Sequence, residues 1–333
     1  MSDTMNAVVA EQIDAPLESI QLPIPMPGPG QVRVKVVASG VNPLDIKISS
    51  GKAPHAQHPF PAVLGLDSAG IVDLVGSRVD QFQPGDRVYG LTGGVGGHQG
   101  SLAEYQVVDA DLLAKAPESI SLREAASIPL IFITAWEGLV DRARVSKGQK
   151  VLVHGGAGGV GRMAIQIARA HGADVYATGR DRDANPIREL GATPINFEAT
   201  TVEAYVNQYT DGEGFDIVYD TVGSEVLDNA FKAVKAYTGH VVSCLGWGTH
   251  SLAPLSFKGA TYSGVFTLMP LLTGKARAHH GEIMRQAAKL VDSGQIGVFQ
   301  DSSRFGLSQI NQAYQHVIAG LARGKVVIDV ADV

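Results

Sequence analysis

The first third of the chain alternates apolar and polar residues in the manner of β-strands. Between residues 31 and 37, valines at every second position alternate with Arg33 and Lys35, which is typical of a half-buried strand. Similar short segments follow at 70–75, 86–91 and 103–108, separated by turns rich in glycine and proline. Four prolines between residues 23 and 29 predict that the stretch before the 31–37 strand is extended and irregular. This spacing of short strands favours a small barrel or sandwich.

The pattern changes near residue 122. A short β-branched run at 151–153 precedes a glycine-rich loop, a helix from about 160 to 171 and a strand at 174–178. Strands that alternate with helices of ordinary length predict a parallel, doubly wound sheet, so the expected fold class is α/β. The same alternation continues through segments 194–195, 215–219, 227–234 and 240–244, and the last part predicts helices at about 276–293 and 308–319 and a strand at 325–330.

Composition excludes several classes of protein. The 333 residues suggest two domains, and 45% hydrophobic residues are enough to bury a large core. A net charge of −6 argues against a nucleic-acid partner. The single cysteine, Cys244, excludes disulfides, iron–sulfur clusters and thiolate-rich zinc sites. The longest apolar run, residues 125–140, is too short to cross a bilayer, and no signal peptide is visible, so we expect a soluble, cytoplasmic protein with no membrane partner.

The glycine-rich loop carries a G-x-G-x-x-G motif. Because it follows a strand and opens a helix, it stands in the context that a dinucleotide site requires. The glycines allow a tight turn and close approach of a pyrophosphate, while the helix N-terminus offers free N–H groups. The alternative is a turn that merely joins strand to helix. The candidate cofactor-binding residues of the loop are Gly156, Ala157, Gly158, Gly159, Val160 and Gly161.

The end of the following strand favours NADPH over NADH. An NAD site usually has an acid at this point, whereas here Thr178 and Gly179 are followed by Arg180. Arginine can bind a 2′-phosphate through two hydrogen bonds, so we expect Arg180 and Arg182 to contact that phosphate. The alternative is that both arginines are solvated charges beside acidic neighbours.

Several catalytic motifs are missing from the sequence. There is no Tyr-x-x-x-Lys pair, no G-x-S-x-G elbow and no phosphate-binding G-x-x-x-x-G-K-[ST] loop. The pairs His55/His58 and His279/His280 lack nearby acids or cysteines, and we interpret them as histidines of surface loops. We therefore expect no metal site.

Together these segments resemble the zinc-independent branch of the medium-chain dehydrogenase/reductase superfamily, the quinone oxidoreductase or zeta-crystallin group. The resemblance covers almost the whole chain. It is carried by residues 40–47, 65–72, 85–88, 125–130, 134–136, 152–161 and 324–327. By motif register, the places of the zinc ligands of alcohol dehydrogenases hold Asn42, Leu66 and Leu130, which supply neither thiolate nor imidazole. The structural zinc lobe is replaced by the glycine-rich stretch 90–100.

The resemblance also implies a domain plan. Residues 1–122 and 270–333 would form a GroES-like β-barrel catalytic domain, and residues 123–269 a Rossmann domain that binds NADP. The family cleft lies between the domains. Relatives dimerise through the edge of the nucleotide-domain sheet, so a homodimer is expected, with strand 260–266 as its apolar edge.

The resemblance assigns roles to particular residues. Asn42 would lie beside the substrate carbonyl, and Lys47 would reach the nicotinamide ribose or the substrate oxygen. Further cofactor-binding positions are Thr134, Phe197, Val222, Gly246, Phe266, Thr267 and Lys325. Each has a plainer alternative. Asn42 precedes a proline and would serve as a turn former, and Lys47 would be an exposed lysine. Asp45 and Asp67 are further candidates for catalytic acids, and we interpret them instead as buried structural carboxylates.

The implied function is NADPH-dependent reduction of quinones or α,β-unsaturated carbonyls by hydride transfer without zinc. Negative charge on the substrate oxygen would be stabilised by the Asn42 amide and the Lys47 ammonium, and water would supply the proton. Two alternatives stay open. One is a low-turnover NADPH-binding protein with a structural or sensing role, and the other is an alcohol dehydrogenase-like enzyme.

Overall fold

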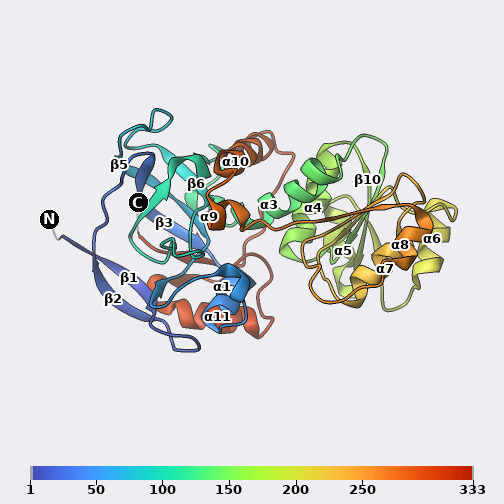
Figure 1. Ribbon diagram of the computed structural model, residues 1–333, viewed down its shortest axis with the longest axis horizontal. Helices are drawn as coiled ribbons and strands as arrows, with labels where there is room; N and C mark the ends of the chain where they lie inside the picture. The colour runs from blue at the N-terminus through green and yellow to red at the C-terminus, as the bar shows by residue number, and fades with distance from the viewer. Residues whose placement is uncertain (1–2, 332–333) are drawn as a thin grey trace. The chain divides into compact units, whose positions relative to one another are not determined.

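The computed structural model describes residues 3–331, which form two compact units (Figure 1). Unit 2 comprises Ile131–Thr267, and unit 1 comprises the chain before and after it. The division therefore falls a few residues from the expected 122/123 and 269/270. Residues 123–130 stay with unit 1 because α2 (Leu122–Ala125) packs on strands of that unit and the Leu130 N–H donates to a carboxylate oxygen of Asp67.

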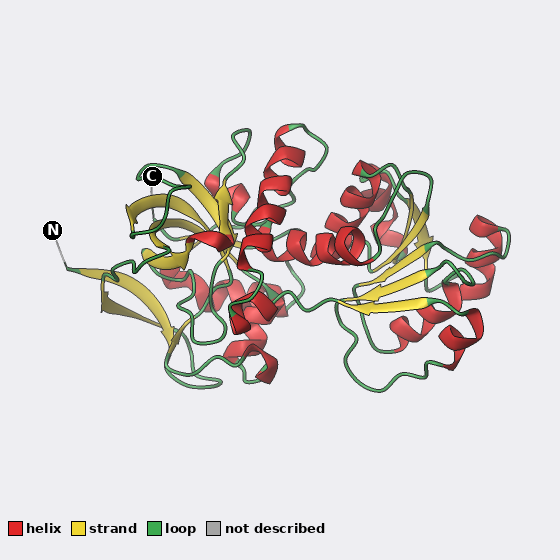
Figure 2. Cartoon of the chain, turned by 45° about the horizontal axis from the view of Figure 1, so that its top comes forward, coloured by secondary structure: helices red, strands yellow, loops and turns green. Residues whose placement is uncertain are grey.

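Unit 2 is built on a six-stranded sheet in which every neighbouring pair is parallel. The order across the sheet is β11-β10-β9-β12-β13-β14, and helices lie on both of its sides (Figure 2). This is the doubly wound sheet that the alternation predicts. In chain order the elements are β9 (Lys150–His154), α4 (Gly159–Ala170), β10 (Asp174–Gly179), α5 (Ala184–Glu189), β11 (Thr193–Asn196), α6 (Val202–Thr210), β12 (Ile217–Asp220), α7 (Glu225–Ala233), β13 (His240–Ser243), α8 (Ala253–Lys258) and β14 (Thr261–Gly264).

The central strands of unit 2 are apolar on both faces because helices cover both. Leu152, Val218 and Val241 come from three adjacent strands and lie in one core cluster with Phe215 and Phe231. Helix α4 turns one apolar face to this sheet and a polar face outward. These long-range contacts hold the carboxyl ends of β9, β10 and β11 in a common row.

Unit 1 contains two sheets whose neighbouring strands are mostly antiparallel. One has the order β2-β1-β4 and the other β15-β16-β3-β5-β6-β8, with β7 also paired to β3. The strands are β1 (Thr4–Ala10), β2 (Glu18–Pro23), β3 (Gln31–Gly40), β4 (Ala62–Val63), β5 (Asp67–Val75), β6 (Arg87–Leu91), β7 (Tyr105–Asp109), β8 (Leu113–Lys115), β15 (Phe305–Gly306) and β16 (Val327–Asp329). The helices besides α2 are α1 (Pro43–Ser49), α9 (Met269–Thr273), α10 (Arg277–Asp292) and α11 (Ile310–Ile318), and α3 (Pro129–Trp136) runs on into unit 2.

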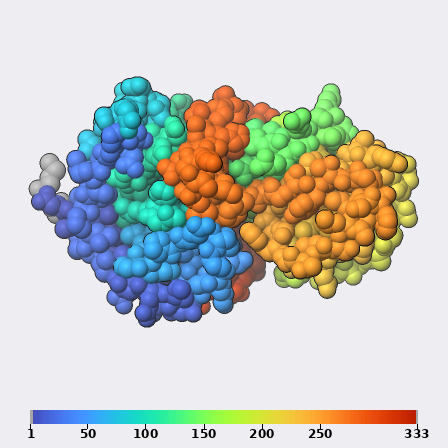
Figure 3. Space-filling model, viewed as in Figure 1, coloured from blue at the N-terminus to red at the C-terminus, as the bar shows by residue number. Residues whose placement is uncertain are grey.

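Segments far apart in the sequence pack together within unit 1. Helix α10 lies against β6 and β8, and Figure 3 shows the orange surface of α9 and α10 adjoining the blue and teal surface of the first hundred residues. The Tyr89 hydroxyl, for example, donates to the carbonyl of Met284 at 2.7 Å. Residues before 122 and after 268 thus build one unit.

Some details differ from the sequence prediction. Strands β1 and β2 and the short helix α1 are additional elements. The expected surface-loop setting of His279 and His280 is wrong, because both lie in α10 and His280 is fully buried. Among residues 3–331, no helix combines the length and apolar character needed to span a bilayer.

Candidate active site

Helix α1 begins where the chain leaves β3. Asn42 occupies the N-cap in extended conformation, and Pro43 follows in the first turn, where a missing N–H costs nothing. The backbone N–H of Asn42 donates to the Asp45 carboxylate at 2.7 Å. The backbone of Asn42 thus forms the turn that starts α1, as the turn-forming interpretation predicts. Its side chain makes separate contacts.

The Asn42 side chain joins a buried polar cluster, which consists of Asn42, Asp45, Asp67 and Lys325. The Asn42 amide nitrogen donates to Asp67 Oδ2 at 2.9 Å and to the Gly40 carbonyl at 3.4 Å, while its oxygen accepts from the Lys325 ammonium. Lys325 Nζ also lies 3.1 Å from Asp67 Oδ2. Asn42 and Asp67 are at most 1% exposed and the Lys325 side chain only 9%.

This arrangement changes the role expected of Asn42. Both hydrogens of its amide have acceptors within the protein, and we propose that Asn42 is a positioning residue and not the donor to a substrate oxygen. Lys47, five residues further along on α1, has an exposed side chain. The Lys47 side chain is thus open to solvent, whereas that of Asn42 is buried.

Asp45 is the second carboxyl group of the cluster. Burial raises its pKa to about 7, repulsion from Asp67 acts in the same direction, and the Asn42 N–H opposes them. Its Oδ1 atom has no hydrogen-bond partner among the residues described. One ammonium thus lies among two buried carboxyls, and Asp45 is about half protonated at pH 7.

The residues at the zinc-ligand positions do not fit a zinc ion. The Asn42 oxygen is occupied by an ammonium, which repels a cation, and Leu66 is a fully buried hydrocarbon side chain. Within residues 3–331, no group of three or more histidine, cysteine, aspartate or glutamate residues is placed to hold a metal. Lys325 is therefore the cation of this cluster, and we derive no step through zinc.

A cavity of about 400 Å³ opens in unit 2 at the carboxyl ends of the strands. This is where open parallel sheets bind nucleotides. Seven of the predicted cofactor-binding residues line it, namely Ala157, Gly158, Thr178, Gly179, Arg180, Phe197 and Val222.

The glycine loop is packed too tightly to accept side chains at two of its positions. A Cβ on Gly161 would clash with the Gly155 carbonyl, and one on Gly156 would lie 2.6 Å from Ala177 Cβ. Gly158 lines the cavity and caps the twelve-residue helix α4, whose first N–H groups point out of its N-terminus. Backbone amides without a bulky side chain are the donors that a pyrophosphate needs.

Other predicted positions lie elsewhere. Arg182 is exposed and is not among the residues that line the cavity, and Lys325 belongs to the cluster in unit 1. Thr134 and Thr267 are hydrogen-bonded to each other at 3.0 Å. Gly246 lies against the Tyr262 hydroxyl, and the Phe266 ring packs edge-on against Trp247.

Several lining residues are additional to the prediction: His154, Gly155, Asp183, Thr200, Val202, Tyr205, Val226 and Asn229. His154 is the last residue of β9, and Gly155, Asp183 and Thr200 follow a parallel strand within four positions, which is the signal that marks them in retrospect. His154 ends β9, and burial lowers its pKa to about 4, so the ring is neutral at physiological pH.

Unit 2 also holds the single cysteine of the chain. The Cys244 sulfur lies 3.9 Å from the Asp220 carbonyl, just beyond the end of β13. Burial, with the Asp220 charge in second place, raises the pKa of this thiol to about 12. The group behaves as a packed thiol and not as a nucleophile.

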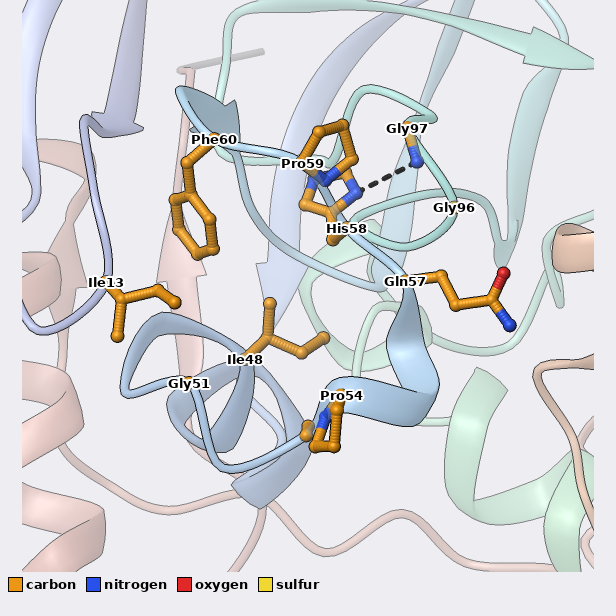
Figure 4. A pocket seen from close by; sticks show the side chains of 11 residues that line it. Ile13, Ile48, Gly51, Pro54, Gln57, His58, Pro59, Phe60, Gly96 and Gly97 are labelled. Atoms are coloured by element: carbon orange, nitrogen blue, oxygen red, sulfur yellow. Dashed lines mark hydrogen bonds between the residues drawn. The ribbon is translucent and has the colours of Figure 1, made fainter.

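A second cavity, of about 580 Å³, lies in unit 1 beside the C-terminal end of α1 (Figure 4). Its wall is mainly apolar, with Ile13, Ile48, Pro54 and Phe60 among the lining side chains. Gly96 and Gly97 contribute backbone from the glycine-rich stretch 90–100, and the Gly97 N–H donates to His58 Nδ1 at 3.1 Å. This cavity suits a hydrocarbon group.

Comparison with known proteins agrees with both units. Residues 28–118 match the alcohol dehydrogenase GroES-like domain, and residues 190–328 match the zinc-binding dehydrogenase domain. The chain is 34% identical over 305 residues to a chloroplastic NADPH-dependent alkenal/one oxidoreductase of Arabidopsis thaliana, an alignment that covers 89% of this chain and 71% of the relative.

Solved structures show the same fold. An alcohol dehydrogenase superfamily protein from Novosphingobium aromaticivorans superposes with a TM-score of 0.96 at 54% identity, covering 98% of this chain and 100% of that one. The quinone oxidoreductase from Coxiella burnetii gives a TM-score of 0.82 at 29% identity, covering 98% and 100%.

The chain belongs to the medium-chain dehydrogenase/reductase family. The predicted fold, a GroES-like domain with a Rossmann domain, is confirmed. As a member of this family the protein is an oxidoreductase of the kind that binds a nicotinamide cofactor. One of the matched domains bears the name of zinc-binding dehydrogenases, yet this chain has an asparagine and two leucines at the ligand positions.

Proposed function

We propose that this medium-chain dehydrogenase/reductase reduces α,β-unsaturated carbonyls or quinones with NADPH. The observation that carries the proposal is the Asn42–Lys325–Asp67 contact, which puts an ammonium where zinc dehydrogenases need metal ligands. An alcohol must lose a proton before it gives up hydride, and zinc assists that loss. The β-carbon of a conjugated carbonyl is already electron-poor and accepts hydride once a hydrogen-bond donor or cation stabilises the oxygen. A cluster that holds an ammonium in place of zinc therefore favours reduction of an enone or quinone.

NADPH, when bound, supplies the hydride. The N–H groups at the start of α4 would bind its pyrophosphate, and Arg180 at the end of β10 would bind the 2′-phosphate. Phe197 and Val222 would contact the adenosine part. The name of the Arabidopsis relative supports NADPH as the cofactor.

Lys47 is our candidate for the catalytic cation. Reduction leaves negative charge on the substrate oxygen, and an exposed ammonium on α1 stabilises that charge. Asn42 and the Lys325–Asp67 pair act through the backbone, because they fix the N-terminus of the helix that carries Lys47. Water protonates the resulting enolate or hydroquinone anion.

The apolar cavity beside Ile48 would receive the hydrocarbon part of the substrate. Its volume lies within the range of about 300–1,000 Å³ that is usual for small-molecule sites. Ile48 follows Lys47 directly on α1, so the proposed oxygen-binding group and the apolar wall come from the same helix.

We further propose that the protein is a homodimer. Strand β14 forms one edge of the sheet in unit 2, and an open edge strand favours pairing with another copy. The strand is shorter than the predicted 260–266, but it has an exposed Tyr262.

A substrate panel tests the proposed function. Linear enones, enals and quinones are offered with NADPH labelled with deuterium at the transferred position, and the product is analysed by mass spectrometry. Stereospecific transfer of deuterium to an enone carbon, or stoichiometric oxidation of NADPH by a quinone, is the expected result. Tight binding of NADPH without turnover of any acceptor would indicate the low-turnover binding protein instead, and oxidation of ethanol or benzyl alcohol would indicate an alcohol dehydrogenase.

A further inference from the structure

The arginine expected to bind the 2′-phosphate is already paired with an acid. Arg180 Nε lies 3.3 Å from Glu198 Oε1, and both side chains are about half exposed, at 52% and 56%. An exposed ion pair of this kind contributes little to folding. It nevertheless decides where the guanidinium lies before any ligand arrives.

The sheet brings these two residues together. β10 and β11 are parallel neighbours in which Gly179 is the partner of Asn196. Arg180 is the first residue after β10, and Glu198 follows two residues after β11. The Asn196 side chain accepts from the Glu198 N–H at 2.9 Å, which fixes the turn that presents the acid. The pairing is therefore a product of the fold and not of sequence proximity.

A second acid, Asp183, lies beside Arg180 in the wall of the unit 2 cavity. The Arg180 backbone N–H donates to Asp183 Oδ2 at 2.9 Å, and Asp183 lines the cavity together with Arg180. Two carboxylates thus lie beside Arg180: Glu198 pairs with its guanidinium, and Asp183 accepts from its backbone N–H. A 2′-phosphate brings about two further negative charges, whereas a 2′-hydroxyl brings none and is a good donor to a carboxylate.

We propose that Glu198 is a specificity-determining residue of the cofactor site, because it holds the Arg180 guanidinium and so reduces the preference for a 2′-phosphorylated dinucleotide. To bind the phosphate, Arg180 must exchange a carboxylate partner for a phosphate partner. The same pairing leaves the binding of an unphosphorylated dinucleotide unaffected. This inference rests on the proposed function, since it takes the cavity of unit 2 to be the cofactor site.

The test uses two fragments that differ only in the 2′-phosphate, 2′,5′-ADP and 5′-AMP, and measures their dissociation constants by calorimetry. No turnover is needed. In Glu198→Gln the affinity for 2′,5′-ADP should rise on the order of fivefold relative to 5′-AMP, the scale of one surface charge acting within about a Debye length. The gain should shrink in 1 M KCl, where a charge effect is screened and a purely structural effect is not.

Glu213→Gln is the matched control. Glu213 is also an exposed glutamate, but it precedes β12 and so lies at the amino ends of the parallel strands, away from Arg180. Its replacement changes the net charge without changing the residues around Arg180. The Glu198→Gln effect should also fall to the level of this control in an Arg180→Gln background, because Glu198 acts through Arg180.

Three results would overturn the proposal: no change in the affinity ratio, equal changes in Glu198→Gln and Glu213→Gln, or an undiminished effect in the Arg180→Gln background. A failure of the premise that the cavity of unit 2 is the cofactor site looks different, because neither fragment, nor NADPH or NADH, would then bind the unaltered protein. A protein that binds these fragments but turns over no enone or quinone would contradict the proposed function and leave the proposal for Glu198 standing.

Discussion

Lys325 and Asp67 form a buried ion pair, with Nζ 3.1 Å from Oδ2, although 258 positions separate them along the chain. Asp67 accepts two further hydrogen bonds, from the Asn42 amide and from the Leu130 N–H at 2.8 Å. A buried charge that loses its partner is costly, so this pair governs both the stability and the shape of the candidate active site.

Removal of the ammonium should destabilise the protein strongly. Lys325→Met leaves Asp67 buried and uncompensated, and we expect a loss of about 3–5 kcal/mol in the free energy of unfolding. The measurement is urea denaturation followed by circular dichroism. Lys115→Met is the control, because the Lys115–Asp86 pair has a 65% exposed lysine and should change stability by less than about 1 kcal/mol. Equal losses in the two variants would show that the cluster is not the stabilising centre described here.

Lys47→Gln should impair turnover and leave the fold intact. The exposed ammonium is the group proposed to stabilise the substrate oxygen, and loss of such a donor typically costs about 10²-fold in rate. Steady-state kinetics with an enone should therefore show a fall in kcat, while the dissociation constant of NADPH stays unchanged. Lys52→Gln, an exposed lysine just beyond α1, serves as the control. Full activity of Lys47→Gln would remove this lysine from the mechanism.

Asp45 should make stability depend on pH between about 4 and 7. Its pKa is higher in the folded protein, about 7, than in the unfolded chain, so protonated Asp45 favours folding and this contribution is lost as the pH rises through that range. Asp45→Asn keeps an acceptor for the Asn42 N–H and has no charge to lose. The free energy of unfolding of Asp45→Asn, measured relative to that of the natural protein, should therefore rise by about 2–3 kcal/mol between pH 5 and pH 8. Urea titrations at several pH values measure the difference, and a difference independent of pH would contradict the assignment.

The apolar cavity should distinguish long substrates from short ones. Ile13 is 54% exposed and lines this cavity, so Ile13→Glu places a charge where a hydrocarbon chain would lie. We expect KM to rise about tenfold for a ten-carbon enone and to change little for butenone. Met26→Glu alters a similarly exposed apolar residue that is not part of the cavity wall, and it should affect neither substrate. Equal effects on both chain lengths would count against the cavity as a substrate site.

The edge strand β14 allows a direct test of dimerisation. Two 35.0 kDa chains should elute together in size-exclusion chromatography with light scattering. The N–H groups of Thr261 and Val265 bond to the β13 side, so that of Tyr262 points to the open edge. Tyr262→Pro removes this outward donor and should yield monomers, whereas Tyr262→Phe should not. A natural protein that is already monomeric would refute the edge-to-edge arrangement.

Local pattern was sufficient to predict most of unit 2. The β-branched strands, the glycine loop and the amphipathic helix α4 are encoded by neighbouring residues. The loop and the end of the next strand supplied Ala157, Gly158, Thr178, Gly179 and Arg180 of the cavity wall, whereas Phe197 and Val222 came from the family resemblance. In unit 1 the N-terminal strand β1 escaped prediction because its burial depends on pairing with β2 and β4 rather than on a clear alternation.

The chemistry of the polar cluster was not predictable from the same information. Asn42 finds its partners 25 and 283 positions away, and no local pattern specifies that its amide hydrogens go to Asp67. The resemblance to known reductases singled out Asn42 and Lys325 but gave them separate roles. Likewise, the motif that identified Arg180 carries no information about Glu198, which reaches it only across two parallel strands.

The environment of Cys244 has a consequence for the proposed reduction of conjugated carbonyls. Such molecules alkylate cysteines, and the attacking species is the thiolate. With a pKa of about 12, the only cysteine of this chain is almost entirely in the thiol form at neutral pH. Under the proposed function, an electrophilic substrate would therefore meet no ionised cysteine in this chain, which should survive prolonged exposure to electrophiles that inactivate enzymes with ionised thiols.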